Sequence, residues 1–129
     1  MLPPQARLRR STDIGRVRQQ GRRWPHPLVV LFVDTQPEVA SPTRFAFAVG
    51  RHIGKATQRN RVKRRLREIV RRCGARTAPT QIAPGYDCLF VARSGAATAN
   101  HTELEGAVLQ LMTRSGVMTV NRESTGTRT

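Results

Sequence analysis

The segment from Gly54 to Cys73, GKATQRNRVKRRLREIVRRC, constrains the fold more than any other part of the chain. When the segment is laid on a helix at about 100° per residue, its apolar side chains fall within one arc of roughly 100°. Such a stripe needs a sheet or another helix to cover it, so the segment predicts an amphipathic helix packed on a core. The stripe consists of Val62, Leu66, Ile69, Val70 and Cys73.

Basic side chains occupy both flanks of this stripe, and Glu68 is the only acidic residue of the segment. Like charges four residues apart, such as Lys63 and Arg67, cost about 0.2–0.5 kcal/mol for each pair, and nothing in the helix offsets that cost. A helix that only faces solvent usually mixes the signs of its charges, so the flanks favour contact with a polyanion. One flank carries Asn60, Lys63, Arg64, Arg67 and Arg71, with Arg59 at its border, and the other carries Arg61, Arg65 and Arg72.

The whole chain shares this basic character. Its 129 residues are enough for one domain, and 23 Lys and Arg stand against 8 Asp and Glu, which gives a formal net charge of +15. The isoelectric point near 11.9 exceeds the value of about 9 that is typical of basic nucleic-acid-binding domains. Such a chain repels itself and is attracted to phosphate.

The remaining sequence predicts two further helices and three strands. The strand at 44–49 is expected to run antiparallel to the strand at 28–34, and the segment 74–84 reads as a loop. The order helix, strand, strand, helix, strand, helix predicts an α+β fold, a small α/β sandwich with helices mainly on one face of one sheet. The expected helices are 11–20 and about 100–116, and the expected strands are 28–34, 44–49 and 86–92.

We expect a single RNA-binding domain over residues 11–116, preceded by a basic flexible arm at 1–10 and followed by a polar flexible tail at 117–129. The sequence has no run of 18 apolar residues and no apolar core of a signal peptide near its first residue, which predicts a cytoplasmic protein without a membrane span. Cys73 and Cys88 lack CxxC spacing and are expected to be reduced core thiols.

Motifs of protein-based catalysis or metal binding are not evident in the sequence. The three histidines are scattered, and His52, in a glycine-flanked basic turn with Arg51, fits a phosphate contact better than a metal ligand. Asn60 lies near the start of the expected helix, where free N–H groups and the helix dipole favour phosphate. Phe32 fits a stacking surface or a core side chain equally well.

The segment 51–68, RHIGKATQRNRVKRRLRE, resembles the signature of the bacterial ribonuclease P protein component, in which a basic pair precedes I-G-x-A-x-x-R-N-R-x-K-R-x-x-R-E. The late strand that ends at Arg93 is also similar to that family, and the resemblance covers about residues 7–115. It implies three helices around a mixed sheet of four strands, with a left-handed βαβ crossover.

The resemblance also implies a function. The protein would pair with a catalytic RNA subunit that binds Mg²⁺, and together they would remove the 5′ leader of precursor tRNA, without an obligate protein partner and without catalytic residues in the protein. A cleft between the sheet and the first helix would take the leader, although Ile14 and Arg18 stand where the family often has aromatic residues. The implied RNA contacts are Arg51, His52, Arg59, Asn60, Arg61, Lys63, Arg64 and Arg67, with Arg71 on the same flank and with Phe32 and Arg18 at the cleft.

Two other classes of function remain open at this point. A structural RNA-binding protein, such as a ribosomal one, has the same size and charge. A DNA-binding module is less favoured, because the basic helix lacks a preceding partner helix joined by a tight turn.

Overall fold

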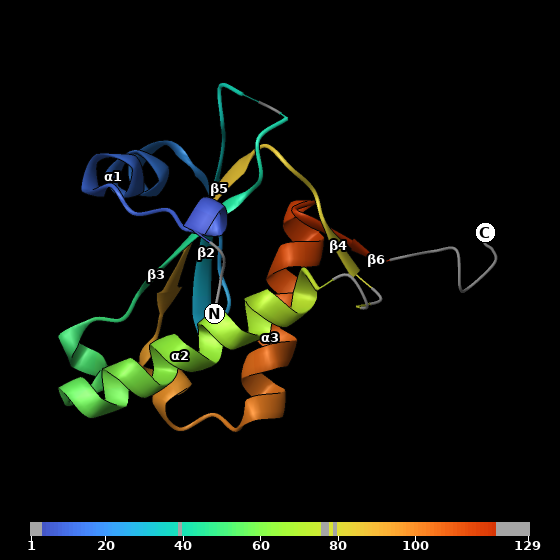
Figure 1. Ribbon diagram of the computed structural model, residues 1–129. Coiled ribbons are helices and arrows are strands. Elements are labelled where there is room, and N and C mark those ends of the chain that lie inside the picture. Colours follow the sequence, from blue (N-terminus) through green and yellow to red (C-terminus); the bar gives the residue numbers. More distant parts are fainter. Residues whose placement is uncertain (1–3, 39, 76–77, 79, 121–129) are drawn as a thin grey trace.

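The computed structural model describes residues 4–38, 40–75, 78 and 80–120, and Figure 1 shows how they are arranged. No helix among these residues is long and apolar enough to cross a membrane. The helices are α1 (Ser11–Gln20), α2 (Ala56–Cys73) and α3 (His101–Ser115), with short 3₁₀ helices η1 (Pro4–Ala6), η2 (Arg51–Ile53) and η3 (Ser94–Ala97). The strands are β1 (Arg22–Trp24), β2 (Val29–Thr35), β3 (Arg44–Ala48), β4 (Thr80–Ile82), β5 (Tyr86–Ala92) and β6 (Met118–Val120).

Four of the described strands form one mixed sheet in the order β1-β2-β5-β3. β2 pairs antiparallel with β1 and with β5, whereas β3 pairs in parallel with β5. A mixed four-stranded sheet with three helices, as the resemblance implied, is thereby confirmed for the described part of the chain. β3 runs opposite to β2, as expected, but β5 lies between them. β3, α2 and β5 form a βαβ unit, and its left-handed sense stays a prediction.

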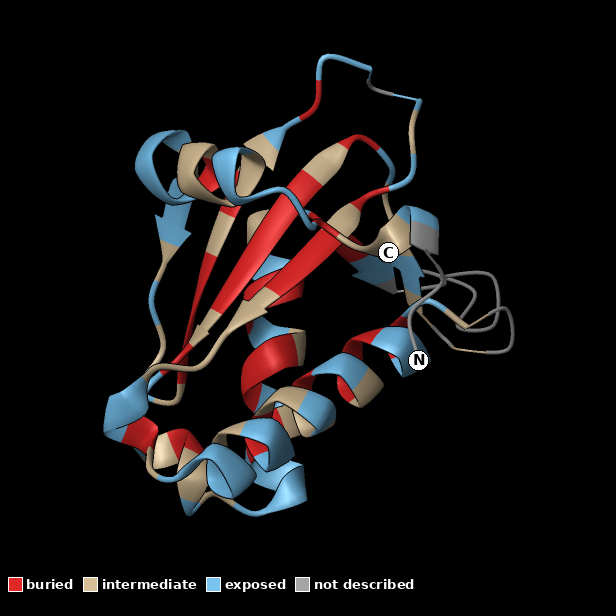
Figure 2. Ribbon diagram, turned by 60° about the vertical axis from the view of Figure 1, so that its left-hand side comes forward, coloured by how far each residue is buried: buried red, intermediate tan, exposed pale blue. Residues whose placement is uncertain are grey.

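The helices divide between the two faces of this sheet. α2 and α3 cover one face and enclose the larger core, in which the predicted stripe of α2 is buried against Leu31 of β2 and Phe90 of β5 (Figures 1 and 2). The shorter α1 covers part of the other face, above a small cluster that includes Val17 and Leu89. Helices mainly on one face were expected, and two of the three described helices lie there.

The start of α2 depends on a turn that favours glycine. Gly54 has a φ of 143°, in the region that residues with a side chain rarely adopt. The next residue, Lys55, caps the helix, and its N–H donates to Oε1 of Gln58 at 3.0 Å. α2 therefore begins at Ala56, and its first turn leads directly into the basic flank.

At both chain ends, the described residues pack on the protein, which differs from the expected flexible arm and tail. The predicted flexible arm at 1–10 packs on the protein where it is described, because Leu8 is buried and its N–H donates to the carbonyl of Phe45 at 2.8 Å. The predicted tail at 117–129 begins with the buried Val117, and β6 then pairs antiparallel with β4, inside the segment expected to be a loop. Burial of apolar side chains at both places explains the difference. Residues 1–3 and 121–129 lie outside the described residues.

Candidate nucleic-acid interface

A groove follows the flank of α2 that faces β3. It consists of three consecutive hollows of about 180, 320 and 220 Å³. Lys63 lines the first and the second hollow, and Phe45 lines the second and the third, so neighbouring hollows share a lining residue. We call this feature the α2 groove. Its lining from α2 includes Arg59, Asn60, Lys63, Arg67 and Arg71, which are residues of the flank that the sequence singled out.

Most cations of α2 are available to a ligand. Within the described ranges, the protein provides no carboxylate within ion-pair distance of Arg59, Arg61, Lys63, Arg64 or Arg67. The Nε of Arg59 is buried and has no hydrogen-bond partner there. No carboxylate of the described protein therefore neutralises the charges of these five residues.

Two arginines of α2 are engaged by the protein. Arg71 donates to both carboxylate oxygens of Glu68, at 3.0 and 2.6 Å, and this exposed pair raises the pKa of Arg71 and lowers that of Glu68. Arg65, on the other flank, donates to the carbonyl of Ala99 at 2.9 Å. Arg71 therefore differs from the other predicted contacts, because it already has a carboxylate partner.

The basic pair lies next to the start of α2. Arg51 and His52 are exposed in η2, while Ile53 of the same turn is buried and anchors it. The structure thus places Arg51 and His52 in the turn that leads, through Gly54, into the first turn of α2.

Phe32 and Arg18 lie away from the α2 groove. Phe32 of β2 is partly buried and packs with the small cluster under α1, and Arg18 is exposed on α1. The predicted contacts therefore divide between the two faces of the sheet. Ile14 of α1 belongs to that small cluster and also lines the second hollow, so the two regions meet beside β3.

The residues of the second hollow that sequence reasoning missed include Phe47, Arg7 and Arg9. Phe47 lies in the strand expected at 44–49, and Arg7 and Arg9 lie in the expected flexible arm, so none of them was predicted at a site. The alternation in RFAFAV puts Phe47 on the same face of β3 as Phe45. No local pattern indicated that β3 is the edge strand beside α2.

The acids of the α1 face form a network with two arginines. Asp87 of β5 is fully buried and accepts from Arg16 at 2.6 Å and from Arg44 at 2.8 Å, and Arg16 also donates to Asp34 at 2.6 Å. The hydrogen bonds to Asp87 are the main reason why the pKa of both arginines is raised. Asp13 lies 3.8 Å from Arg16. We call these five residues the Asp87 network.

Together, these features define a class: small basic α+β proteins in which one cationic helix lies open beside a mixed sheet. The family model for ribonuclease P matches residues 2–116. The chain belongs to the ribonuclease P protein family.

Similar proteins agree with this assignment. The chain is 41% identical over 106 residues to the ribonuclease P protein component of Herpetosiphon aurantiacus, covering 82% of this chain and 80% of that relative. It is 37% identical to that of Acidothermus cellulolyticus, covering 98% and 99%. The solved ribonuclease P protein of Thermotoga maritima has 26% identity and a TM-score of 0.70, covering 84% and 96%. That of Staphylococcus aureus, at 20% identity, 87% and 96% coverage and a TM-score of 0.75, shares the fold.

Proposed function

We propose that this protein is the protein subunit of a ribonuclease P ribonucleoprotein in the cytoplasm. It binds the catalytic RNA subunit and the 5′ leader of precursor tRNA, and it assists the Mg²⁺-dependent endonucleolytic removal of the leader. The observation that carries the proposal is the α2 groove, with unpaired cations such as Arg59 and Lys63, in a chain that belongs to this family. An obligate protein partner is not part of the proposal.

In this proposal the protein contributes charge and position, and the RNA subunit contributes the metal. Mg²⁺ prefers clusters of oxygen ligands, and within the described residues no group of three or more His, Cys, Asp and Glu could hold a metal ion. Glu68, the acid of α2, is engaged by Arg71. These residues do not fit a protein-held Mg²⁺ site, so we assign the ion to the RNA subunit.

The role of the cations follows from electrostatics. The RNA subunit and the leader are both polyanions, so bringing them together costs repulsion that an interposed basic surface reduces. Each phosphate that the protein neutralises also releases counterions, which makes binding strongly dependent on salt. Arg61 and Arg64 are exposed on α2 outside the lining of the groove, and they extend the basic surface across the helix.

The two regions suggest a division of contacts. We place the single-stranded leader on the α1 face, where Phe32 and Ile14 offer partly buried apolar surface and Arg18 offers a guanidinium plane for stacking. Arg51 and His52, beside the start of α2, add phosphate contacts to the α2 region. A DNA-reading role is disfavoured, because η2 and β3 precede α2 where a helix-turn-helix requires a partner helix.

A cleavage assay on precursor tRNA at low Mg²⁺ tests the proposal, with the protein alone, with a bacterial ribonuclease P RNA alone, and with both. We expect no cleavage by the protein alone and faster leader removal with both than with the RNA alone. Arg64→Ala should reduce the stimulation, whereas Arg114→Ala, at an exposed position in the last turn of α3, should not. A leader-removal rate that the wild-type protein does not change would reject the proposal.

A further inference from the structure

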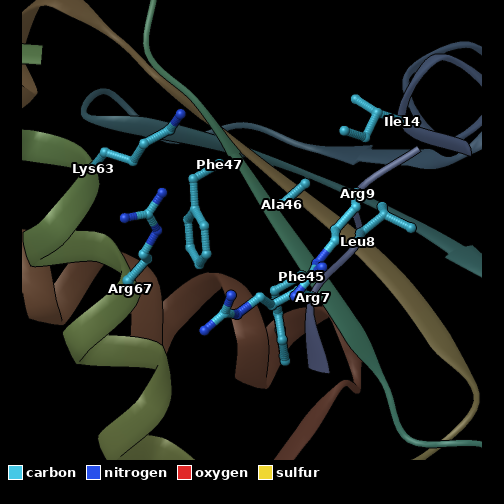
Figure 3. Close-up of a pocket in the computed structure, with 9 residues that line it drawn as sticks. All are labelled: Arg7, Leu8, Arg9, Ile14, Phe45, Ala46, Phe47, Lys63 and Arg67. Carbon is cyan, nitrogen blue, oxygen red and sulfur yellow. The ribbon is translucent and has the colours of Figure 1, made fainter. Parts of the chain in front are cut away.

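The second hollow of the α2 groove combines an apolar floor with a cationic rim. Phe45 and Phe47 of β3 form the floor, and the charged residues that line the hollow are all cations. Figure 3 shows Lys63 and Arg67 extending from α2 towards Phe47, while the side chain of Arg7 comes from the N-terminal segment. Its volume of about 320 Å³ lies at the lower end of small-ligand sites, which span roughly 300–1,000 Å³.

The ring of Phe47 packs against another aromatic ring of the core. It stacks on the fully buried Phe90, with ring centroids 5.8 Å apart and an interplanar angle of 8°. Phe45 stacks on Phe90 as well, at 6.4 Å and 18°, but it is only 3% exposed. Phe47 is partly exposed and lines the hollow, so it offers an aromatic surface that is already ordered before a ligand binds.

Two of the cations beside this ring, Lys63 and Arg67, have no carboxylate partner among the described residues. Lys63 and Arg67 lie one turn apart on α2, and in the described chain the protein offers neither of them a carboxylate within 4.0 Å. Two like charges at this spacing repel each other, and a phosphate between them would remove that repulsion. If Phe47 served only the core, its packing would not require the unpaired charges of Lys63 and Arg67 beside it.

We propose that this hollow is a subsite for one nucleotide of single-stranded RNA, with the base stacked on Phe47 and a phosphate between Lys63 and Arg67. The proposal rests on the proposed function only in taking RNA as the ligand. A base inside a duplex is covered on both faces by its neighbours, so only an unpaired nucleotide can present its ring to Phe47. Stacking on an aromatic side chain tolerates any base, because every base has a π-face.

The test is a cycle between Phe47→Leu and abasic RNA. A labelled single-stranded RNA, with one abasic nucleotide placed at each position in turn, is titrated with the full-length wild-type and variant proteins. For the wild type, we expect one position at which removal of the base weakens binding by about five- to 150-fold, the range of base–aromatic stacking. In Phe47→Leu that position should lose its sensitivity, and Phe47→Tyr, which keeps an aromatic ring, should retain it.

A structural role for Phe47 predicts a different result. Loss of packing would weaken binding of all the RNAs by the same factor and leave the abasic profile unchanged, which would overturn the proposal. A fully paired duplex of the same sequence provides a second check. If Phe47→Leu weakens binding of the duplex as much as it weakens binding of the single strand, the proposal is also overturned. If Phe47→Leu melts below the assay temperature, Phe47→Met replaces it, because methionine fills a similar space without a ring.

The same proteins separate this inference from the proposed function. Wild-type protein that stimulates precursor-tRNA cleavage, but shows no position whose sensitivity depends on Phe47, would refute the subsite and leave the function standing. Wild-type protein that shows the Phe47-dependent position, but does not stimulate a bacterial ribonuclease P RNA, would support the subsite and reject the function.

Discussion

The substitution Asp87→Asn tests how α1 is held on the sheet. The carboxylate of Asp87 is fully buried and accepts three hydrogen bonds, one from Arg16 of α1 at 2.6 Å and two from Arg44 of β3 at 2.8 Å. The amide of asparagine keeps the shape but removes the negative charge, so the two arginines would face each other with less compensation. α1 would lose an anchor that its short apolar side cannot replace, since Val17 is its only fully buried residue in the structure as described.

The size of the effect follows from burial. Removing one partner of a buried ion pair costs about 3–5 kcal/mol. The side chains of Arg16 and Arg44 are 28% and 33% exposed, so water solvates them partly in the variant. We therefore expect a loss of about 2–4 kcal/mol in the free energy of unfolding, out of a total of about 5–15 kcal/mol for a domain. Urea unfolding followed by far-ultraviolet circular dichroism measures this loss.

A second substitution, at Arg16, tests whether the residues of the Asp87 network act together. Asp34 and Asp87 stand directly opposite each other in the β2–β5 register, and Arg16 donates to both. Arg16→Gln leaves these two carboxylates facing each other, which is destabilising in a sheet. In the double variant Asp87→Asn removes one of those charges, so the two losses should not add. Surface substitutions usually change the free energy of unfolding by no more than about 0.5 kcal/mol. A change this small for Asp87→Asn would refute the reasoning.

Three further predictions concern the α2 groove and the buried thiols. Arg67→Ala should reduce the slope of log K against log salt for single-stranded RNA by about 0.7, one phosphate contact, whereas Arg114→Ala should not change it; anisotropy titrations over a salt series check this. Glu68→Gln should tighten RNA binding by releasing Arg71. Because Arg71 lowers the pKa of Glu68, the gain should be present above that pKa and fade as the pH falls through it; weaker binding by the variant at neutral pH would contradict this. Burial raises the pKa of Cys73 to about 11, so iodoacetamide should modify this thiol slowly at about pH 8 unless urea is present. The contribution of the neutral thiol to stability is complete below about pH 8.5, the pKa of an unfolded cysteine, and is lost as the pH rises towards the folded pKa.

The sequence predicted the long, regular elements well, because their side-chain period leaves few ways to bury them. The stripe of α2 and the strand at 86–92 are buried as expected. β1, β4 and β6 were not predicted, since each has three residues and no period can be read from so few. These strands are defined by their partners, as in the pairs Trp24 with Leu31 and Ile82 with Met118, and three residues alone carry no signal of such pairing.

The candidate site was also predictable only in part. Helical spacing placed Asn60, Lys63 and Arg67 on one flank, and they line one groove. The spacing could not show that Phe47 borders the same hollow, because that depends on the position of β3 at the sheet edge, which follows from strand order. Nor could it separate Arg71 from its neighbours, since the pairing with Glu68 competes with any ligand.

The distribution of acids explains how a chain of net charge +15 keeps one surface open. Asp13, Asp34 and Asp87, three of the eight acids, lie with Arg16 and Arg44 on the α1 face. Another, Glu103, is engaged at the start of α3, where its carboxylate accepts from the N–H of Asn100 at 2.9 Å. These carboxylates stabilise the fold away from α2, whose unpaired cations repel each other until a polyanion binds. RNA that binds only the folded state should therefore stabilise the protein, by about 2.7 kcal/mol at one hundred times its Kd. Asp87→Asn changes no residue of α2, so RNA that binds through α2 alone should stabilise that variant by the same amount. A smaller gain would show that α1, whose Ile14 lines the second hollow, is coupled to the binding surface.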